Sequence, residues 1–453
     1  MTDALHATIR RSMSTAPSLQ NLIVCASFMP RVLLPNLMFE DELDGTAHKV
    51  PALARKSAGQ LAAVMGLLAS HVGNVSDPDD IVIVSDDEIP SDIPPALQHV
   101  RFETLSSLSR MNLAEYGFQP WGWSNAAIAL GRKLGLQFSA PDADVVRFVN
   151  SRQFLASRDD CRPVSVTAAA GEFPAGRLCQ SMTQVSDALQ EFSALGFTMW
   201  VIKSNLSQAA RNRLCGTGVE IPVTTRNWLQ KRFDQLQPVY VEPWFDRVAE
   251  CGLQFHVPPI SLEEPIEFLG GCEMLTDDTG RYRGSIVSTT LQGWWHRAIP
   301  RCAEIAATAR QMGFFGPMGM DCMLVRHSQD EQLWLRPCHD VNGRFTMGRV
   351  ALSLRHWLQP GEIGYWCHRV AKSGDPGQNL FEQQAGEDVR IIPTSPARYG
   401  SEKTTFQTAF LISADCGLLT SVVSRILSQN IRGPFDQLFA SDLSTAANEK
   451  SSP

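Results

Sequence analysis

Residues 339–348 read His-Asp-Val-Asn-Gly-Arg-Phe-Thr-Met-Gly. Asp340 and Asn342 alternate along a segment that is expected to be extended, so both side chains point to the same face. Arg344 lies two residues further and shares that face, where a guanidinium can bind phosphoryl oxygens through two hydrogen bonds. The pattern Asp-x-Asn-x-Arg favours a phosphate site, although an ordinary polar turn after a strand would also explain it.

An acid opens the strand that precedes this segment. Residues 316–321 read Gly-Pro-Met-Gly-Met-Asp, and the apolar residues 322–325 that follow predict a buried strand. A buried carboxylate costs free energy unless it is paired or bound to a cation. Asp321, Asp340 and Asn342 together are the oxygen ligands that Mg²⁺ takes while it bridges phosphates. We therefore predict a metal site here, and the alternative is a turn whose acid caps a strand.

Two earlier strands end in charged residues. Residues 197–204 predict a strand that carries Lys203 at its end, well placed to bind phosphate as a point charge. Residues 239–244 read Val-Tyr-Val-Glu-Pro-Trp, and such a strand can place backbone groups and the Glu242 carboxylate along a flat ligand. The alternatives are an exposed lysine at a strand end and an edge strand with a surface acid.

Composition bounds the class of protein. The chain has 453 residues with 44% hydrophobic content, which predicts a globular protein of two or three packed units. The net charge of −7 argues against a nucleic-acid partner, because such proteins carry a basic footprint. No apolar stretch approaches the ~20 residues that span a bilayer, so no membrane association is expected. The 11 cysteines form no CxxC pair, and we expect reduced thiols in a cytoplasmic protein.

The pattern of apolar residues predicts how the chain is organised. Strands at 22–26 and 80–85 flank a helix at 55–72, which is the beginning of an α/β layer. Residues 118–123, with two tryptophans, are expected in a loop. The middle of the chain alternates predicted helices, at 185–195, 227–236 and 300–312, with strands at 197–204, 239–242, 252–258, 267–275 and 284–290.

The order of these motifs resembles the ATP-grasp superfamily. It is most similar to a bacterial group of ATP-grasp proteins of unassigned substrate that look like carboxylate–amine ligases. In that group a lysine-ended strand precedes a VEP-W strand, a G-GP-G-D strand and an E-x-N-x-R-x-T-M-G strand. Here the order reads Val201-Ile202-Lys203, Val241-Glu242-Pro243-Trp244, Gly313…Gly316-Pro317…Gly319…Asp321 and Asp340 to Gly348. The resemblance covers residues 118–358.

The resemblance implies a fold of mixed α/β and α+β class. An N-terminal α/β domain, of the kind that precedes ATP-grasp folds, would be followed by a two-lobed ATP-grasp fold that binds ATP between its lobes. The implied domains are 1–145 (N-terminal), 146–365 (ATP-grasp, with lobes 146–245 and 246–365), 366–440 (a C-terminal extension packing on the core) and 441–453 (a disordered tail).

The resemblance also implies how the nucleotide is held. Lys203 would contact the α- and β-phosphates as a catalytic residue. Arg152 stands where family members usually carry a first phosphate-binding lysine. Glu250 would bind ribose, a role that Glu242 could share. The adenine hinge would come from Glu242, Pro243 and Trp244.

The implied metal site repeats the one predicted from the residues. Asp321, Asp340 and Asn342 would hold Mg²⁺, with Mn²⁺ as an alternative. Arg344 would face the transferring phosphoryl group as a catalytic residue. Family members normally carry Glu at the position of Asp340, which is one methylene shorter.

The implied activity is ligation of a carboxylate to an amine through an acyl phosphate, with release of ADP and phosphate. The partners would be small-molecule or peptide acids and amines, and homodimers are common among such ligases. Two alternatives stay open. The shorter Asp340 and the scarcity of glycine in the phosphate-covering loop would fit a catalytically impaired nucleotide-binding or regulatory protein. A kinase-like phosphotransferase would stop at a phosphorylated product.

Overall fold

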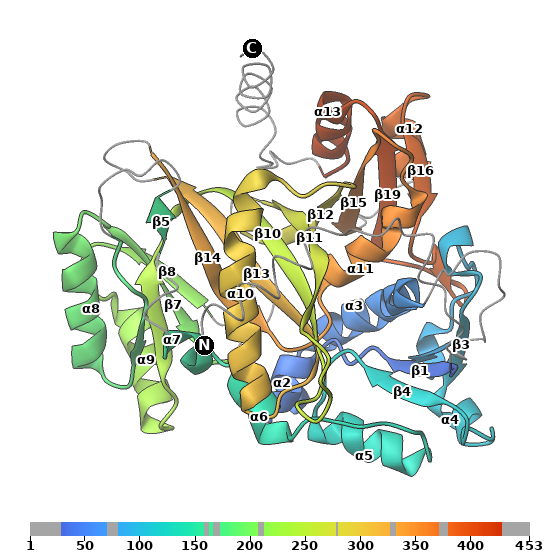
Figure 1. Ribbon diagram of the computed structural model, residues 1–453, viewed down its shortest axis with the longest axis horizontal. Helices are drawn as coiled ribbons and strands as arrows, with labels where there is room; N and C mark the ends of the chain where they lie inside the picture. Colours follow the sequence, from blue (N-terminus) through green and yellow to red (C-terminus); the bar gives the residue numbers. More distant parts are fainter. Residues whose placement is uncertain are drawn as a thin grey trace.

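A computed structural model of the chain describes residues 29–69, 80–157, 163–165, 173–206, 213–277, 280–326, 332–370 and 379–427. The strand predicted at 22–26 and the tail predicted at 441–453 lie outside these residues. The architecture is the expected mixture of α/β and α+β (Figure 1). The described residues form a parallel sheet of four strands, antiparallel sheets of nine and four strands, and a two-stranded hairpin. No helix in this described part combines the length and the apolar character that crossing a membrane requires.

The N-terminal sheet has four parallel strands in the order β3-β2-β1-β4. They are β1 (Arg31–Leu34), β2 (Ile81–Val84), β3 (Arg101–Thr104) and β4 (Gly117–Pro120). The fully buried β2 confirms the strand predicted at 80–85. The loop predicted at 118–123 is wrong in its first half, because Phe118 to Pro120 pair with β1. That pairing depends on a partner strand far away in the sequence.

The α-helices of the described N-terminal part of the chain lie between residues 39 and 156. They are α2 (Phe39–Leu43), α3 (Ala52–Ala62), α4 (Leu105–Leu108), α5 (Asn125–Lys133), α6 (Ala143–Val149) and α7 (Arg152–Ala156). The helix predicted at 55–72 is α3, which continues as the 3-10 helix η2 (Ala63–Leu68). Other 3-10 helices are η1 (Ala47–Lys49), η3 (Asp86–Glu88), η4 (Pro95–Leu97) and η5 (Leu354–Trp357).

The small sheet is antiparallel, in the order β6-β9-β7-β8. Its strands are β6 (Arg177–Cys179), β7 (Met199–Ser204), β8 (Arg213–Thr217) and β9 (Val239–Pro243). Helices α8 (Met182–Ala194) and α9 (Val223–Asp234) bury Leu189 and Leu229 in one cluster with these strands. Both helices were predicted, and both begin a few residues before the predicted start.

The large sheet is antiparallel and has nine strands in the order β16-β19-β15-β12-β11-β10-β13-β14-β5. They are β5 (Val164–Ser165), β10 (Asp246–Val257), β11 (Glu267–Thr276), β12 (Tyr282–Val287), β13 (Gly316–Arg326), β14 (Leu333–Asn342), β15 (Ile363–Val370), β16 (Arg390–Pro393) and β19 (Phe406–Ser413).

Helix α10 (Gly293–Gln311) crosses one face of the large sheet (Figure 1). The sequence predicted this helix over residues 300–312. In the structure Pro300 lies inside the helix, which begins at Gly293. The helix buries Trp295, Cys302 and Ile305. Helix α11 (Met347–Ser353) follows β14 and contacts β11 and β12.

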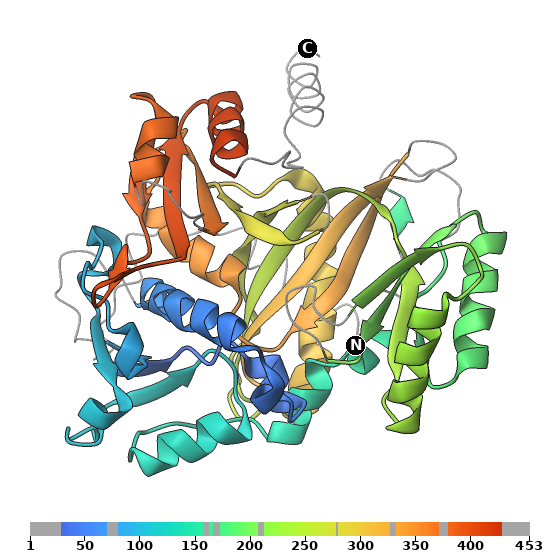
Figure 2. The same cartoon turned by 180° about the vertical axis from the view of Figure 1, so that it is seen from behind.

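The C-terminal segment continues the large sheet beyond β12. Strands β15, β19 and β16 add to its edge, together with α12 (Asn379–Ala385), α13 (Cys416–Leu427) and the hairpin of β17 (Arg398–Tyr399) and β18 (Glu402–Lys403). Figure 2 shows these orange and red elements above α3, which is blue. The domain boundaries given above stay predictions.

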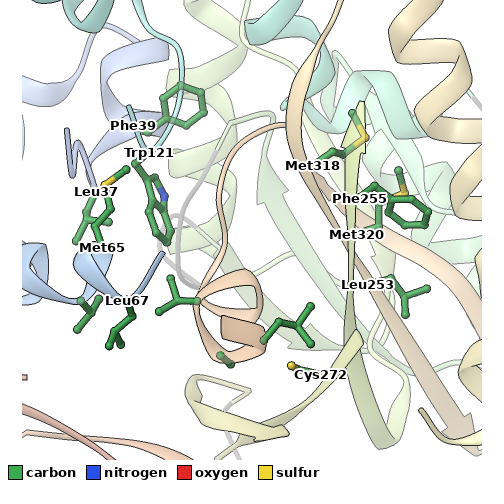
Figure 3. Close-up of a cluster of buried hydrophobic side chains, with 14 of the residues drawn as sticks. Leu37, Phe39, Met65, Leu67, Trp121, Leu253, Phe255, Cys272, Met318 and Met320 are labelled. Atoms are coloured by element: carbon green, nitrogen blue, oxygen red, sulfur yellow. The ribbon is translucent and has the colours of Figure 1, made fainter. Parts of the chain in front are cut away.

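The largest hydrophobic cluster joins the N-terminal sheet to the large sheet. Its members include Leu37, Phe39, Met65, Leu67 and Trp121 from the N-terminal part and Leu253, Phe255, Cys272, Met318 and Met320 from the large sheet (Figure 3). Trp121 is fully buried, and its ring centroid lies 6.3 Å from that of Phe345. Because this core is continuous, it fixes how the two sheets face each other.

Gln60 joins α3 to the C-terminal segment. Its side chain is buried, and its Oε1 accepts hydrogen bonds from the Thr405 N–H at 2.9 Å and from the hydroxyls of Thr404 and Thr405 at 3.2 and 2.7 Å. The hydroxyl of Tyr399 donates to the Gln60 carbonyl. These bonds hold α3 against the end of the large sheet.

We expect Gln60→Ala to lower the free energy of unfolding by about 1–3 kcal/mol, because buried donors lose their acceptor. Urea unfolding followed by circular dichroism measures the change. Lys56→Ala is the control on the same helix, since its ion pair with Glu402 is exposed and should leave the midpoint unchanged. Equal stability of Gln60→Ala and the wild type would contradict this account.

Candidate active site

One cavity of about 800 Å³ lies where the N-terminal, small and large sheets meet. It is lined by every residue that the sequence predicted for the site: Arg152, Lys203, Glu242, Pro243, Trp244, Glu250, Asp321, Asp340, Asn342 and Arg344. The fold therefore brings together side chains that lie far apart in the sequence. The individual roles of these side chains in binding and catalysis are proposals.

Strand register places the acidic residues on one face of the large sheet. Residues directly opposite each other in an antiparallel pair share a face. Asp321 on β13 is opposite Asp340 on β14 and opposite Gly252 on β10. The next position along the same face pairs Gly319 with Asn342. The predicted juxtaposition of the three oxygen-bearing side chains agrees with this register.

A bulge in β14 adds a further side chain to the cavity. Asp321 pairs with Asp340, whereas Met323 pairs with Arg336, so β14 contains extra residues between these pairs. Bulges of this kind redirect side chains and are common beside active sites. As a result, the consecutive residues His339 and Asp340 both line the cavity.

Each of the three predicted metal ligands takes part in a hydrogen bond with another side chain of the cavity. Asn342 Nδ2 donates to Asp321 Oδ2 at 3.3 Å, and Arg152 Nη2 donates to Asp340 Oδ2 at 3.3 Å. Burial raises the pKa of Asp321 to about 7, and the negative charges of Asp340 and Glu250 add to the shift. A carboxylate whose ionisation is opposed in this way is one that a cation would stabilise.

The donor set fits Mg²⁺. In the described ranges, no three His, Cys, Asp or Glu side chains form a metal cage of their own. Mg²⁺ does not need one, because it commonly binds through one or two carboxylates and completes its shell with phosphate oxygens and water. Asp321, Asp340 and Asn342 are the residues that would hold it. The Asn342 amide would have to turn, since its Oδ1 accepts a hydrogen bond from Arg344 Nη2 at 3.0 Å.

Glu242 connects the small sheet to the large sheet through buried ion pairs. It accepts a hydrogen bond from Arg336 Nη1 at 2.7 Å on one oxygen and pairs with Lys203 Nζ through the other. Burial alone would raise the pKa of Glu242, but Arg336 and Lys203 outweigh it and hold the pKa well below the ordinary value. Both carboxylate oxygens are thus engaged, and the side chain fixes Lys203 at the cavity wall.

The predicted adenine hinge runs beside β7. The Trp244 N–H donates to the Met199 carbonyl at 2.9 Å, and Pro243 has no N–H, so neither residue offers a free backbone donor here. The guanidinium carbons of Arg213 and Arg247 lie 5.3 and 5.0 Å from the centre of the Trp244 ring. This end of the cavity is therefore both aromatic and basic.

Glu250, the predicted ribose ligand, is buried beside two basic groups. Its Oε2 accepts a hydrogen bond from Arg247 Nη1 at 3.0 Å, and its Oε1 lies 3.7 Å from His339 Nε2. Burial lowers the pKa of His339 well below its ordinary value, and the charges of Lys203 and Arg336 act in the same direction. The ring is therefore neutral. Its two nitrogens have no hydrogen-bond partner among the described residues.

Arg344 meets an acid from the N-terminal part of the chain. Its guanidinium contacts Glu40 Oε1 at 2.5 Å and also donates to Asn342. Glu40 lies in α2, 304 residues earlier, and its Oε2 is buried without a hydrogen-bond partner in the described structure. The sequence analysis missed Glu40. No local pattern marks it, because the contact arises only from tertiary packing.

Arg336 and Gln254 were also missed. Arg336 carried a detectable signal, since a charge directly after the apolar stretch Leu333–Leu335 must find a partner when it is buried. Gln254 Oε1 accepts a hydrogen bond from Thr346 Oγ1 at 2.8 Å, and Thr346 also caps α11. This bond holds the segment after Asn342 over the sheet.

Comparisons with known proteins address the fold. Neither a protein family nor a curated protein matches the sequence. Among solved structures, an ADP complex of purK, N5-carboxyaminoimidazole ribonucleotide synthetase, matches with a TM-score of 0.51 and 10% identity over 90% of this chain and 98% of that chain. An N5-carboxyaminoimidazole synthase from Aspergillus clavatus has a TM-score of 0.48 and 9% identity, covering 89% of this chain and 99% of that chain. A biotin carboxylase from Campylobacter jejuni has a TM-score of 0.48 and 10% identity, covering 85% and 87%.

The chain has the ATP-grasp fold. The purK structure carries this conclusion, because it matches over almost the whole of both chains. The fold class expected from the order of the sequence motifs is thereby confirmed. At 10% identity the match establishes the fold and leaves the activity to be inferred from the site.

We expect Glu242→Gln to lower the free energy of unfolding by about 3–5 kcal/mol at neutral pH, because two buried cations lose their counter-charge. The folded-state pKa of Glu242 lies below the ordinary value of 4.5. The stabilisation is therefore complete above pH 4.5 and is lost as the pH falls through the folded-state pKa. Urea unfolding should show a difference between wild type and variant that is largest near pH 7 and shrinks in acid.

The matched control is Glu362→Gln, whose ion pair with Arg390 lies at the surface outside the cavity. It should unfold like the wild type at every pH tested. A Glu242→Gln variant as stable as the wild type at pH 7 would refute the structural role given to this carboxylate.

Proposed function

We propose that the chain is an ATP- and Mg²⁺-dependent ligase that joins a carboxylate to an amine through an acyl phosphate. The observation that carries the proposal is one cavity in which the paired carboxylates of Asp321 and Asp340 lie among Arg152, Lys203 and Arg344. Paired acids for a divalent ion and several cations for phosphate are what phosphoryl transfer from ATP requires. The ATP-grasp fold supports the same reading as an analogy of fold.

The proposed chemistry has two steps. A carboxylate oxygen of the acid attacks the γ-phosphorus of ATP, the bond to the β-phosphate oxygen breaks, and ADP leaves. The amine nitrogen then attacks the acyl carbon of the acyl phosphate, loses a proton, and displaces inorganic phosphate. When bound, Mg²⁺ supplies charge neutralisation on the phosphate oxygens.

The side chains of the cavity have distinct roles in this scheme. Lys203 and Arg152 approach from β7 and α7 and bind the phosphates of ATP. Arg344 faces the transferring phosphoryl group and stabilises the charge that develops there. Asp321 and Asp340 orient the ion, and positioning by these residues supplies most of the rate.

The proposal also includes the cellular compartment, the size of the substrates and the oligomeric state. The nine cysteines of the described residues are all free thiols, which suits the reducing cytoplasm. The acid and the amine are proposed to be small molecules or short peptides, and the active form a homodimer. The first lobe, 146–245, and the second lobe, 246–365, would close on ATP.

We expect Asp321→Asn and Asp340→Asn each to lower acid-dependent ADP release by roughly a hundredfold or more, because each removes a charged ligand of the ion. A coupled assay for ADP in the presence of ATP, Mg²⁺ and a panel of amino acids and short peptides measures the rate. Asp92→Asn is the control, since Asp92 is exposed and does not line the cavity. Full turnover in both site variants would overturn the metal assignment.

The acyl phosphate itself can be trapped. With hydroxylamine in place of the amine, we expect a hydroxamate to form in an amount that matches the ADP released, because hydroxylamine attacks acyl phosphates. Mass spectrometry detects the product. A stable phosphoester without hydroxamate would favour a kinase-like enzyme. Tight ATP binding without Mg²⁺ dependence and without turnover would favour a nucleotide-binding protein.

A further inference from the structure

The cavity extends from the paired carboxylates across the large sheet. Asp321 is flanked on β10 by Gly252, which is in turn opposite Cys272 on β11. A Cβ built on Gly252 would lie 3.7 Å from Asp321 Oδ1 and 3.2 Å from the terminal methyl of Met274. Gln254 Nε2 would also lie 3.2 Å from that Cβ, so the missing side chain gives room to Gln254 and Met274, which line the cavity beside Asp321. Beyond the Gln254 amide, the lining next to Asp321 continues with the sulfur-bearing side chains of Met274 and Cys272.

An aromatic wall closes the cavity beyond Met274. Along the same face of the sheet, Met274 is opposite Ser285, which is opposite Trp366 on β15. His368 lines the cavity two residues after Trp366, and the rings of Tyr282 and Phe406 meet His368 edge-on, with centroids 5.1 and 5.7 Å away. The wall therefore presents ring surface to the cavity.

The wall carries no net charge. Burial lowers the pKa of His368 to about 3, so its ring is neutral at physiological pH. The hydroxyl of Tyr282 is hydrogen-bonded to Ser285 Oγ at 2.8 Å, which satisfies the polar end of that side chain. The ring faces themselves are therefore uncharged. Arg281 and Arg283, on either side of Tyr282 in the sequence, also line the cavity, and Arg283 is paired with Asp277. His368 Nε2 is buried without a hydrogen-bond partner among the described residues.

Helix α3 lines the cavity next to this wall. Ala54, Ala58 and Leu61 recur at spacings of three and four residues, so they share one helix face, and all three line the cavity. Among the described residues up to Trp121, the lining contains no charged side chain, although α3 itself carries Arg55 and Lys56. The helix presents its apolar face inward and is held there by Gln60.

The geometry points to a substrate acid with an apolar side chain, aliphatic or aromatic, that lies against α3 and the wall of Tyr282, His368 and Phe406. Its carboxylate would lie toward Asp321 and Arg344. This inference rests on the proposed ligase function and names the class of acid. The hydrophobic effect favours such a side chain, whereas an ammonium or a second carboxylate placed against the apolar α3 face and the three rings would be desolvated beside uncharged groups.

The probes are hexanoate and 3-phenylpropanoate, with 6-aminohexanoate and hexanedioate as comparators that differ from hexanoate by a charged end. Calorimetry measures the binding of each probe to the full chain with Mg²⁺ and ADP present. A separate titration measures the binding of ADP with Mg²⁺. We expect the apolar probes to bind at least about tenfold more tightly than the charged comparators.

Two variants test whether α3 sets this preference. Ala54→Glu should invert it, because the introduced carboxylate repels hexanoate and can pair with the ammonium of 6-aminohexanoate. Ala52→Glu is the matched control, since Ala52 lies on the exposed face of the first turn of the same helix and should keep the wild-type preference. Ala58→Trp fills the space instead and should abolish binding of 3-phenylpropanoate. Both cavity variants should bind ADP as the wild type does.

The outcomes separate this inference from the proposed function. Binding of ADP with equal or tighter binding of the charged comparators, or with no binding of the apolar probes, would overturn the apolar substrate class alone. An unchanged preference in both Ala54→Glu and Ala58→Trp would do the same. Failure of the wild type to bind ADP with Mg²⁺ would overturn the proposed function instead.

Discussion

The buried carboxylate of Glu242 is the constraint on which the site depends. It lies between Lys203 of the small sheet and Arg336 of the large sheet, so a single acid ties together two parts of the fold that border the cavity. Its side chain is only 4% exposed, and an isolated charge at that depth would be costly. The two cations offset that cost. The same ion pairs fix the positions of Lys203 and Arg336 in the cavity. The cavity is therefore charged and preorganised at the point where the sheets join.

The same logic applies to the other cations of the cavity. Arg152 is paired with Asp340, and Arg344 is paired with Glu40, so each cation assigned to phosphate already faces an acid. Internal pairing explains how so many ionised groups share one buried space. Under the proposed function, binding of a triphosphate with its divalent ion would therefore be an exchange of partners. The phosphates would take over from the acids, and the ion would take over from the guanidinium beside Asp340.

The features that could be predicted from the sequence are those that depend on residues close together in the chain. The residues of the site lie in short motifs at the ends of strands, and alternation along β14 places Asp340 and Asn342 on one face without knowledge of the fold. What could not be predicted depends on distant pairing. β4 forms only because β1 lies beside it, and the contact of Glu40 with Arg344 spans most of the chain. The apolar end of the cavity could not be predicted for the same reason. It combines α3 with β12 and with β15 and β19, which follow the last motif.

The departures from the family pattern bear on whether the site is competent. Two were apparent in the sequence: Arg152 replaces a lysine, and Asp340 replaces a glutamate. In the structure these two residues contact each other, with Arg152 Nη2 3.3 Å from Asp340 Oδ2. A guanidinium is larger than an ammonium and donates from several nitrogens, whereas aspartate is one methylene shorter than glutamate. The longer reach of one side chain therefore offsets the shorter reach of the other across the same gap. Arg152 and Asp340 thus form an acid–base pair beside Asp321, and the shorter side chain of Asp340 does not by itself argue that the site has lost its chemistry.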